Sequence, residues 1–214
     1  MNLLDDLLEL INEKYKLAPI DTSEYDGLKV SGMIFDIKAY EAAGLGHVST
    51  MAAKGFLGLM KMDTLIIVPK DIDLPLFSYD RIKAMGKETL IIELYDTCLE
   101  KCNLKSLQNI VDNENAFTKY ETEGRWYDSI KLPESIGFKG KKKDSEMFDA
   151  ISLDYLQAFL SVYAEPVTDL EAKSAKSAAY VDGLLWHGGP STDVFVKSIG
   201  KEKTTNLFKD VLFL

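Results

Sequence analysis

The chain has 214 residues, of which 46% are hydrophobic and 28% charged, a composition typical of a globular protein. At this length we expect one domain spanning residues 1–214. The net charge of -9 argues against a nucleic-acid partner, because neutralising phosphates needs a concentrated basic surface.

The apolar runs of the chain are short. The longest, such as residues 65–68 and 90–92, are far below the length that crosses a bilayer. Residues 1–13 carry four acidic side chains ahead of the first lysine, whereas a signal peptide begins with positive charge. We therefore expect no membrane partner and a cytoplasmic location.

The first half of the chain predicts one helix followed by a meander of strands. Leucines at helical spacing indicate an amphipathic helix over residues 2–15. Alternating apolar residues or turn-bounded apolar runs then predict strands, over residues 33–39, 48–52, 64–68, 77–84 and 89–95. The last two strands are joined by a tight turn around Gly86, which predicts a hairpin. Strands joined by short glycine turns must be antiparallel neighbours.

After Thr97 the pattern changes to helical periodicity. A helix is predicted across residues 99–111, and residues 126–140 are expected to be irregular. Further helices are predicted from Ser145 onward, over residues 168–186, up to Gly200, and around residues 207–212. Helices on both sides of a continuous sheet define a mixed α/β class, a three-layer α/β/α sandwich with a central antiparallel sheet.

Several familiar kinds of chemistry find little support in the sequence. Cys98 and Cys102 would lie on one helical face as free thiols, and two cysteines are too few for a zinc or iron–sulfur site, so no metal is expected. The chain has two histidines and no GxSxG or Walker motif. The run from Gly44 to Ser49 lacks the third glycine of a dinucleotide-binding loop, which favours a hairpin turn.

Asp80 is a candidate proton donor. It lies in the predicted strand over residues 77–84, just after a loop that contains Pro75. A carboxyl group held in a pocket between the sheet and a helical layer would be desolvated, which raises its pKa towards neutrality. The alternative is that Asp80 faces water on the outer side of the sheet, and the pattern alone leaves both interpretations open.

A short basic segment contrasts with the acidic chain. Lys139, Lys141, Lys142 and Lys143 surround Gly140. This cluster predicts either a docking site for an acidic partner or simply a solvated loop.

The run IVPKDIDLPLFSYD, residues 67–80, resembles the signature of the ferredoxin-dependent bilin reductases and the related red chlorophyll catabolite reductases. The closing LFKDVLF, residues 207–213, is similar to the end of that family. The resemblance implies a three-layer α/β/α fold and the reduction of a linear tetrapyrrole. It also implies that ferredoxin is an external electron donor, that no flavin or metal is bound, and that pocket carboxyl groups supply protons.

The resemblance also implies roles for individual residues. Asp80 falls on the central proton-donating aspartate of the family, and Asp63 on a position where some members carry a histidine. An Asn-Asp pair of several bilin reductases is replaced by Gly188-Gly189, so His187 or Asp193 is the candidate for a second acid.

Ligand contacts are predicted from side-chain chemistry. Phe77, Tyr79, Trp126 and Trp186 would suit a pocket for a flat apolar molecule, although each is equally compatible with the core. Arg81 or Arg125 would clamp a propionate, because a guanidinium group forks onto a carboxylate. The altered family acids keep a second hypothesis open, a non-catalytic protein that binds a tetrapyrrole or another flat apolar ligand on the same scaffold.

Overall fold

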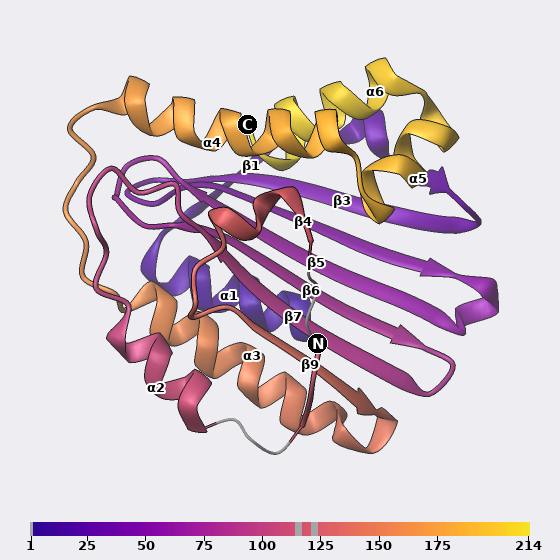
Figure 1. Cartoon of the computed structure of the whole chain (residues 1–214). Coiled ribbons are helices and arrows are strands. Elements are labelled where there is room, and N and C mark those ends of the chain that lie inside the picture. Colours follow the sequence, from indigo (N-terminus) through magenta and orange to yellow (C-terminus); the bar gives the residue numbers. More distant parts are fainter. Residues whose placement is uncertain (1, 114–116, 121–123) are drawn as a thin grey trace.

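A central antiparallel sheet organises the structure, a computed structural model that describes residues 2–113, 117–120 and 124–214. The described residues form nine strands in the order β1-β3-β4-β5-β6-β7-β9-β8, with β2 paired to β3 (Figure 1). The strands are β1 (Leu17–Ile20), β2 (Leu28–Val30), β3 (Met33–Ala42), β4 (Gly46–Gly55), β5 (Met60–Pro69), β6 (Leu76–Ala84), β7 (Lys87–Tyr95), β8 (Thr118–Lys119) and β9 (Ile136–Lys141).

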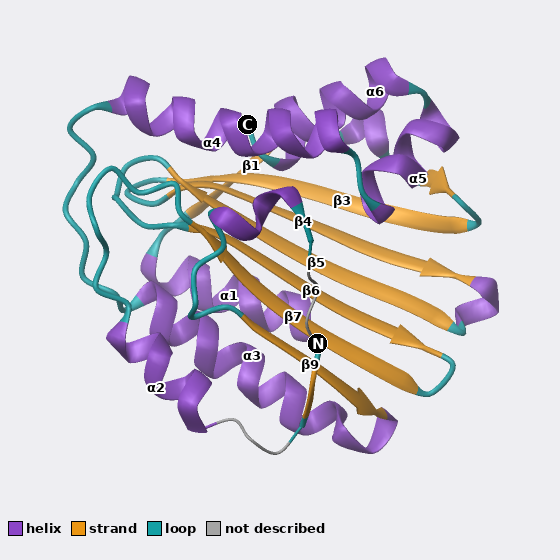
Figure 2. Ribbon diagram, in the orientation of Figure 1, coloured by secondary structure: helices purple, strands orange, loops and turns teal. Residues whose placement is uncertain are grey.

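Helices cover both faces of this sheet. One layer holds α1 (Leu3–Lys14), α2 (Lys105–Asn113) and α3 (Ser145–Leu160), and the other holds α4 (Leu170–His187), α5 (Pro190–Ile199), α6 (Lys201–Asn206) and the π-helix η5 (Leu207–Leu212) (Figure 2). Short 3-10 turns are η1 (Ser23–Tyr25), η2 (Phe56–Gly58), η3 (Trp126–Ser129) and η4 (Lys142–Asp144). The predicted class, an α/β/α sandwich with an antiparallel sheet, is confirmed.

Strand alternation separates two hydrophobic cores. Side chains such as Leu65, Phe77 and Ile92 point towards α1 and α3, and the rings of Phe77 and Phe159 lie 5.0 Å apart. The intervening residues, such as Ile66 and Leu76, point towards the C-terminal helices. A residue's parity along its strand therefore decides which helical layer it meets.

Polar contacts fix the C-terminal layer to the sheet. The His47 Nε2–H donates to the Val211 carbonyl at 2.8 Å, and the Ser49 hydroxyl donates to the Leu212 carbonyl at 2.7 Å. Burial lowers the pKa of His47 to about 4, so this imidazole is neutral in the folded protein at neutral pH. Buried Lys173 of α4 forms an ion pair with Asp73 at 3.0 Å.

Two sequence-based predictions about the middle of the chain are wrong. Residues 99–102 are not helical, because the Asp73 carboxylate accepts the backbone N–H groups of Leu99 and Glu100 and holds them in a loop. Within the segment expected to be irregular, residues 136–141 form strand β9, where Gly137 gives the backbone of Tyr120 room to pair.

The two cysteines are free, as predicted, but they do not share a helical face. Their sulfur atoms lie 3.0 Å apart in the loop before α2. Across the ranges that the structure describes, no helix is both long and apolar enough to span a membrane.

Candidate functional site

Asp80 lies in the middle of the sheet, on the face towards the C-terminal helices. Its direct cross-strand partner on β5 is Thr64, whose hydroxyl donates a hydrogen bond of 2.5 Å to Asp80 Oδ1. Along β6, Leu76 and Ser78 share this face by alternation. The sequence left open whether Asp80 meets a helical layer or solvent, and its parity places it on the side of the helical layer.

The surroundings of Asp80 make it a carboxylic acid suited to proton transfer near neutrality. Burial raises the pKa of Asp80 to about 6, the hydrogen bond from Thr64 opposes this rise, and the nearby charge of Glu93 adds to it. A group with this pKa holds its proton in a useful fraction of molecules at physiological pH and releases it readily.

Glu93 is a second carboxylate on the same face. It pairs in register with Ser78 on the neighbouring strand, so it lies diagonally beside Asp80. The Tyr95 hydroxyl donates to Glu93 Oε2 at 2.5 Å, and Lys131 Nζ lies 3.6 Å from Oε1. Glu93 therefore has hydrogen-bonding and charged partners of its own, whereas the hydrogen-bond partner of Asp80 is Thr64.

The sheet around Asp80 is partly open, which distinguishes this face from the other. Of the residues on β5, β6 and β7 that share this orientation and keep intermediate exposure, we call the seven nearest the middle of the sheet the β5–β7 patch: Met62, Ser78, Asp80, Ile82, Thr89, Ile91 and Glu93. Their neighbours Tyr79, Leu90 and Ile92, which point to the opposite face, are buried. The C-terminal helices therefore leave an accessible surface of mixed polarity around the candidate acid.

Aromatic side chains border the β5–β7 patch. The rings of Tyr95 and Tyr180 lie 4.4 Å apart, and Trp126 is 5.8 Å from Tyr180. On its other side Trp126 stacks on His187 at 5.3 Å with an interplanar angle of 18°. This row of rings from β7, α4 and η3 offers flat surfaces for a conjugated ligand.

Four predicted site residues lie on the wrong face for a site around Asp80. Phe77, Tyr79 and Arg81 occupy alternate positions of β6 and point towards α1 and α3. Asp63 pairs in register with Arg81 and shares that face. Because neighbouring residues of a strand point in opposite directions, residues adjacent to Asp80 in sequence cannot line the same pocket.

Arg81 is a structural cation rather than a free clamp. It is buried, it donates to Glu88, and its Nη2 lies 3.6 Å from Asp149. Asp63 lines a cavity of about 620 Å³ on the Arg81 face, where burial raises its pKa while nearby lysines, Lys83 foremost, oppose the rise. The Asp63 carboxyl group therefore has an unusual environment, but not one shared with Asp80.

His187 and Asp193 come together at the end of α4. They line a cavity of about 640 Å³ with Arg125 and Trp126. Trp126 and Tyr180 link this cavity to the β5–β7 patch through ring contacts, so His187 is a neighbour of the site and not a partner of Asp80. Trp186 points away from both, being 84% exposed, and its predicted ligand contact is not supported.

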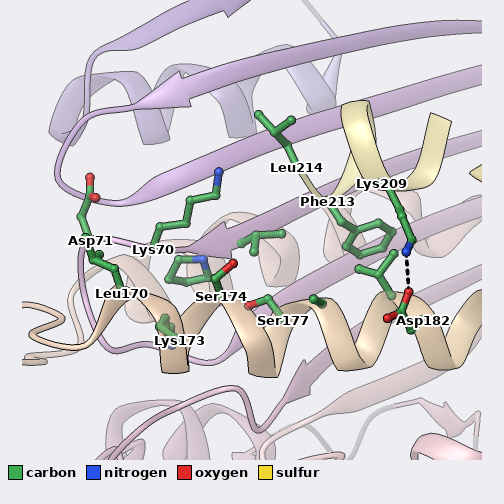
Figure 3. A pocket seen from close by; sticks show the side chains of 14 residues that line it. Lys70, Asp71, Leu170, Lys173, Ser174, Ser177, Asp182, Lys209, Phe213 and Leu214 are labelled. Carbon is green, nitrogen blue, oxygen red and sulfur yellow. Dashed lines mark ion pairs between the residues drawn. The ribbon is translucent and has the colours of Figure 1, made fainter. Parts of the chain in front are cut away.

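A third cavity, of about 580 Å³, lies between α4 and the ends of the strands, beside the final residues of the chain (Figure 3). Val68, Val181 and Phe213 line its apolar part. Lys209 forms an ion pair with Asp182 at 2.6 Å, which the dashed line in Figure 3 marks, and Lys173 forms an ion pair with Asp73. Lys70 contributes an amine at the rim.

The predicted docking lysines lie away from these cavities. Lys139 and Lys141 belong to β9, while Lys142 and Lys143 form part of η4. All four are exposed, so they remain available to an acidic partner.

Thr64 and Glu93 are the residues that sequence reasoning missed. A two-residue turn at Gly86 fixes the register of the β6–β7 hairpin, in which Ser78 pairs with Glu93. The position of Glu93 could therefore have been predicted from the turn. Thr64 is separated from β6 by a loop, and no turn pattern sets its register. In the part of the chain that the structure describes, no group of three or more His, Cys, Asp or Glu side chains is placed to hold a metal ion.

The architecture and this helix-covered, partly open sheet define a class of fold, an antiparallel α/β/α sandwich. One solved structure that shares this fold is phytochromobilin synthase from tomato, crystallised in complex with biliverdin. It has a TM-score of 0.77, it is 18% identical in sequence, and the match covers 99% of this chain and 81% of that chain. Comparisons with protein-family models and with curated proteins yield no match.

Proposed function

We propose that the chain binds a linear tetrapyrrole against the β5–β7 patch and reduces it with electrons delivered by ferredoxin. The observation that carries this proposal is the Asp80 carboxyl group, whose pKa of about 6 lies near neutrality, on a partly exposed face bordered by aromatic rings. The likeness to phytochromobilin synthase, which was crystallised with biliverdin, supports the choice of ligand class.

Each residue of the candidate site has one role in the proposed reduction. Reduction of one double bond takes two electrons and two protons. Reduced ferredoxin is the one-electron donor, used twice. Asp80 gives one proton to the ligand, is reprotonated from solvent, gives the second proton, and is reprotonated again, so both protons come in the end from solvent. Burial chiefly keeps the pKa of Asp80 high, and the nearby Glu93 adds to the effect. Trp126, which is half-buried, stacks against the conjugated system, and buried Tyr180 supports the Trp126 ring from the core.

Two surface features complete the proposal. A carboxylate of the ligand would meet Arg125, which lines the cavity beside Trp126 and is exposed. The exposed lysines Lys139, Lys141, Lys142 and Lys143 would attract an acidic ferredoxin, so turnover should slow as salt screens these charges.

Turnover of biliverdin by reduced ferredoxin, followed by visible absorption without oxygen, tests the proposal. Asp80→Asn keeps the shape of the side chain but supplies no acidic proton, and we expect turnover to fall by at least about a hundredfold, as for the loss of a general acid. Asp63→Asn is the matched control, because it makes the same change on the opposite face of the sheet, and we expect near-normal turnover.

The same assay decides between an enzyme and a binding protein. If biliverdin changes its spectrum on mixing but no absorption is lost in the parent protein or in either variant, the chain binds the ligand without reducing it. Equal losses in Asp80→Asn and Asp63→Asn would contradict the assignment of Asp80.

A further inference from the structure

One end of the sheet exposes large apolar side chains on two neighbouring hairpins. Leu57 is 105% exposed, Leu59 63% and Phe56 57%, all between β4 and β5, and Met85 between β6 and β7 is 85% exposed. The Met85 N–H donates to the Leu59 carbonyl at 3.2 Å, so the tips touch and form one surface, which we call the hairpin-tip surface. Both tips lie at the right of Figure 1, at the end of the sheet where β4 joins β5 and β6 joins β7.

The backbone of these tips is strained. Phe56, Leu57 and Met85 have φ values of 51°, 55° and 48°, in the left-handed region that favours glycine. A residue with a side chain loses roughly 1–2 kcal/mol in this region. Neither the backbone strain nor the exposure of these apolar side chains stabilises the isolated protein. We therefore look for a function of the tips in contact with another molecule or surface.

Lysines surround the apolar tips. Lys54, Lys61 and Lys83 are consecutive partners in register across β4, β5 and β6, so like charges lie directly opposite one another. Lys87 begins the strand after Met85. The acidic member of this row, Glu88, is buried and bound by Arg81, so it is not displayed at the surface. In a chain of net charge -9, this end is basic.

The lysine row also opens onto a recess. Lys54, Lys61, Lys83 and Arg81 line the cavity of about 620 Å³ on the α1 and α3 side, together with Asp36, Asp63 and Asp149. Arg81 is 1% exposed, and its Nε and Nη1 have no hydrogen-bond partner among the described residues. Because these two donors are buried, the exposed cations at the recess are Lys54 and Lys61.

We infer that the hairpin-tip surface docks onto a membrane rich in anionic phospholipids. Phe56, Leu57, Leu59 and Met85 enter the boundary between headgroups and acyl chains, and the lysine row binds headgroup phosphates. An acidic protein would satisfy the lysines alone and leave the four apolar side chains exposed, so the lipid surface fits better. The sequence indicated no membrane partner because it has no spanning run, but this surface is assembled from separate hairpins.

Vesicle binding by the full chain tests the inference. We expect cosedimentation with vesicles of phosphatidylcholine mixed with phosphatidylglycerol, little with phosphatidylcholine alone, and weakening by salt. Phe56→Gly with Leu57→Gly should lower the affinity at least about tenfold, as expected for the loss of two inserted side chains. Glycine accepts positive φ, so this variant should fold at least as well as the parent.

A second variant tests the contribution of the lysine row to vesicle binding. Lys54→Gln with Lys61→Gln should weaken binding by about fivefold for each charge removed. Lys197→Gln with Lys201→Gln, on the exposed C-terminal helices, is the matched charge control, and Tyr163→Ser, 80% exposed elsewhere, is the matched apolar control. Both controls should bind like the parent.

Several outcomes would overturn the inference. These are no binding to anionic vesicles, binding that survives the glycine variant, or binding of an acidic ferredoxin through Lys54 and Lys61 without any vesicle binding. Asp80→Asn should bind vesicles normally, so failure of membrane docking and failure of the reductase proposal give different results.

Discussion

The two faces of the sheet have the same strands but opposite characters. On the α1 and α3 face, Phe77 and Tyr79 are 1% exposed and pack into a closed apolar core. On the other face, Ser78 and Asp80 lie one residue away in sequence and remain partly exposed. Alternate residues of one strand, β6, therefore contribute to the apolar core and to the candidate site. Substitution of single side chains can test this division.

The largest expected difference is in packing. Phe77→Ala removes a ring that contacts Phe159 at 5.0 Å, and we expect it to lower the free energy of unfolding by about 3–5 kcal/mol. Ile91→Ala, in the β5–β7 patch, removes a half-buried side chain and should lower it by about 1 kcal/mol. Urea unfolding measures both. Equal losses would mean that the two faces are packed alike.

A second contrast concerns charge. Arg81→Met removes the closest partner of buried Glu88 and leaves only Lys83, 4.0 Å away, so we expect the free energy of unfolding to fall by about 3 kcal/mol. Adding Glu88→Leu should recover most of the loss, because two apolar side chains replace the buried pair. Thermal or urea unfolding of the two variants gives this comparison.

The same variants separate structure from ligand binding. If Arg81 clamped a ligand carboxylate, the double variant would be stable yet unable to bind biliverdin. We expect it instead to bind biliverdin like the parent, which an absorption titration will show.

The pH dependence of stability distinguishes two groups on the C-terminal face. The folded pKa of His47 is lowered to about 4 from 6.5, so its contribution to stability is complete above pH 6.5 and is lost as the pH falls towards 4. The folded pKa of Asp80 is raised to about 6 from 3.8, so its contribution is complete below 3.8 and is lost as the pH rises through 6. The two contributions have opposite signs over the same window.

Single variants should reveal these opposing terms. Relative to the parent, His47→Gln should gain stability as the pH falls from 6.5 to 4, whereas Asp80→Asn should lose it, each by on the order of 2 kcal/mol. Urea unfolding at several pH values measures the differences. Parallel curves for the two variants would contradict the environments assigned to His47 and Asp80.

Local patterns in the sequence were sufficient for most of the elements but not for the site. The leucine spacing of α1 and the Gly86 turn of the β6–β7 hairpin are local signals, and both elements form as predicted. Strand β9 escaped prediction because its two glycines conceal the alternation and its pairing depends on distant β7. Helix α2 begins six residues late because a long-range contact, Asp73 with Leu99 and Glu100, outweighs local periodicity.

The candidate site shows the same limit more sharply. The resemblance was sufficient to predict Asp80 as the candidate acid. Its orientation can be predicted from strand alternation once the face of one neighbouring residue on β6 is known. The predicted companion Asp63 was taken from the resemblance, and Phe77, Tyr79 and Arg81 were chosen by side-chain chemistry. Alternation sends all four to the opposite face. The actual companions, Thr64 and Glu93, depend on register between strands, which only the hairpin to Glu93 encodes locally.

The smallest expected effect is also the most direct test of this local assignment. The hydrogen bond from the Thr64 hydroxyl favours the charged form of Asp80, so Thr64→Val should raise the pKa of Asp80 above 6. We expect a rise of up to about one unit. One unit corresponds to about 1.4 kcal/mol, and a hydrogen bond to a charged group contributes a similar amount. Carbon-13 NMR titration of the carboxyl group measures this without any need for turnover. Ser78→Ala is the matched control, because Ser78 shares the face and the partial exposure but does not hydrogen-bond to Asp80. A pKa that moves in Ser78→Ala and not in Thr64→Val would mean that the register between β5 and β6 differs in solution, and the candidate site would then have to be rebuilt around a different neighbour.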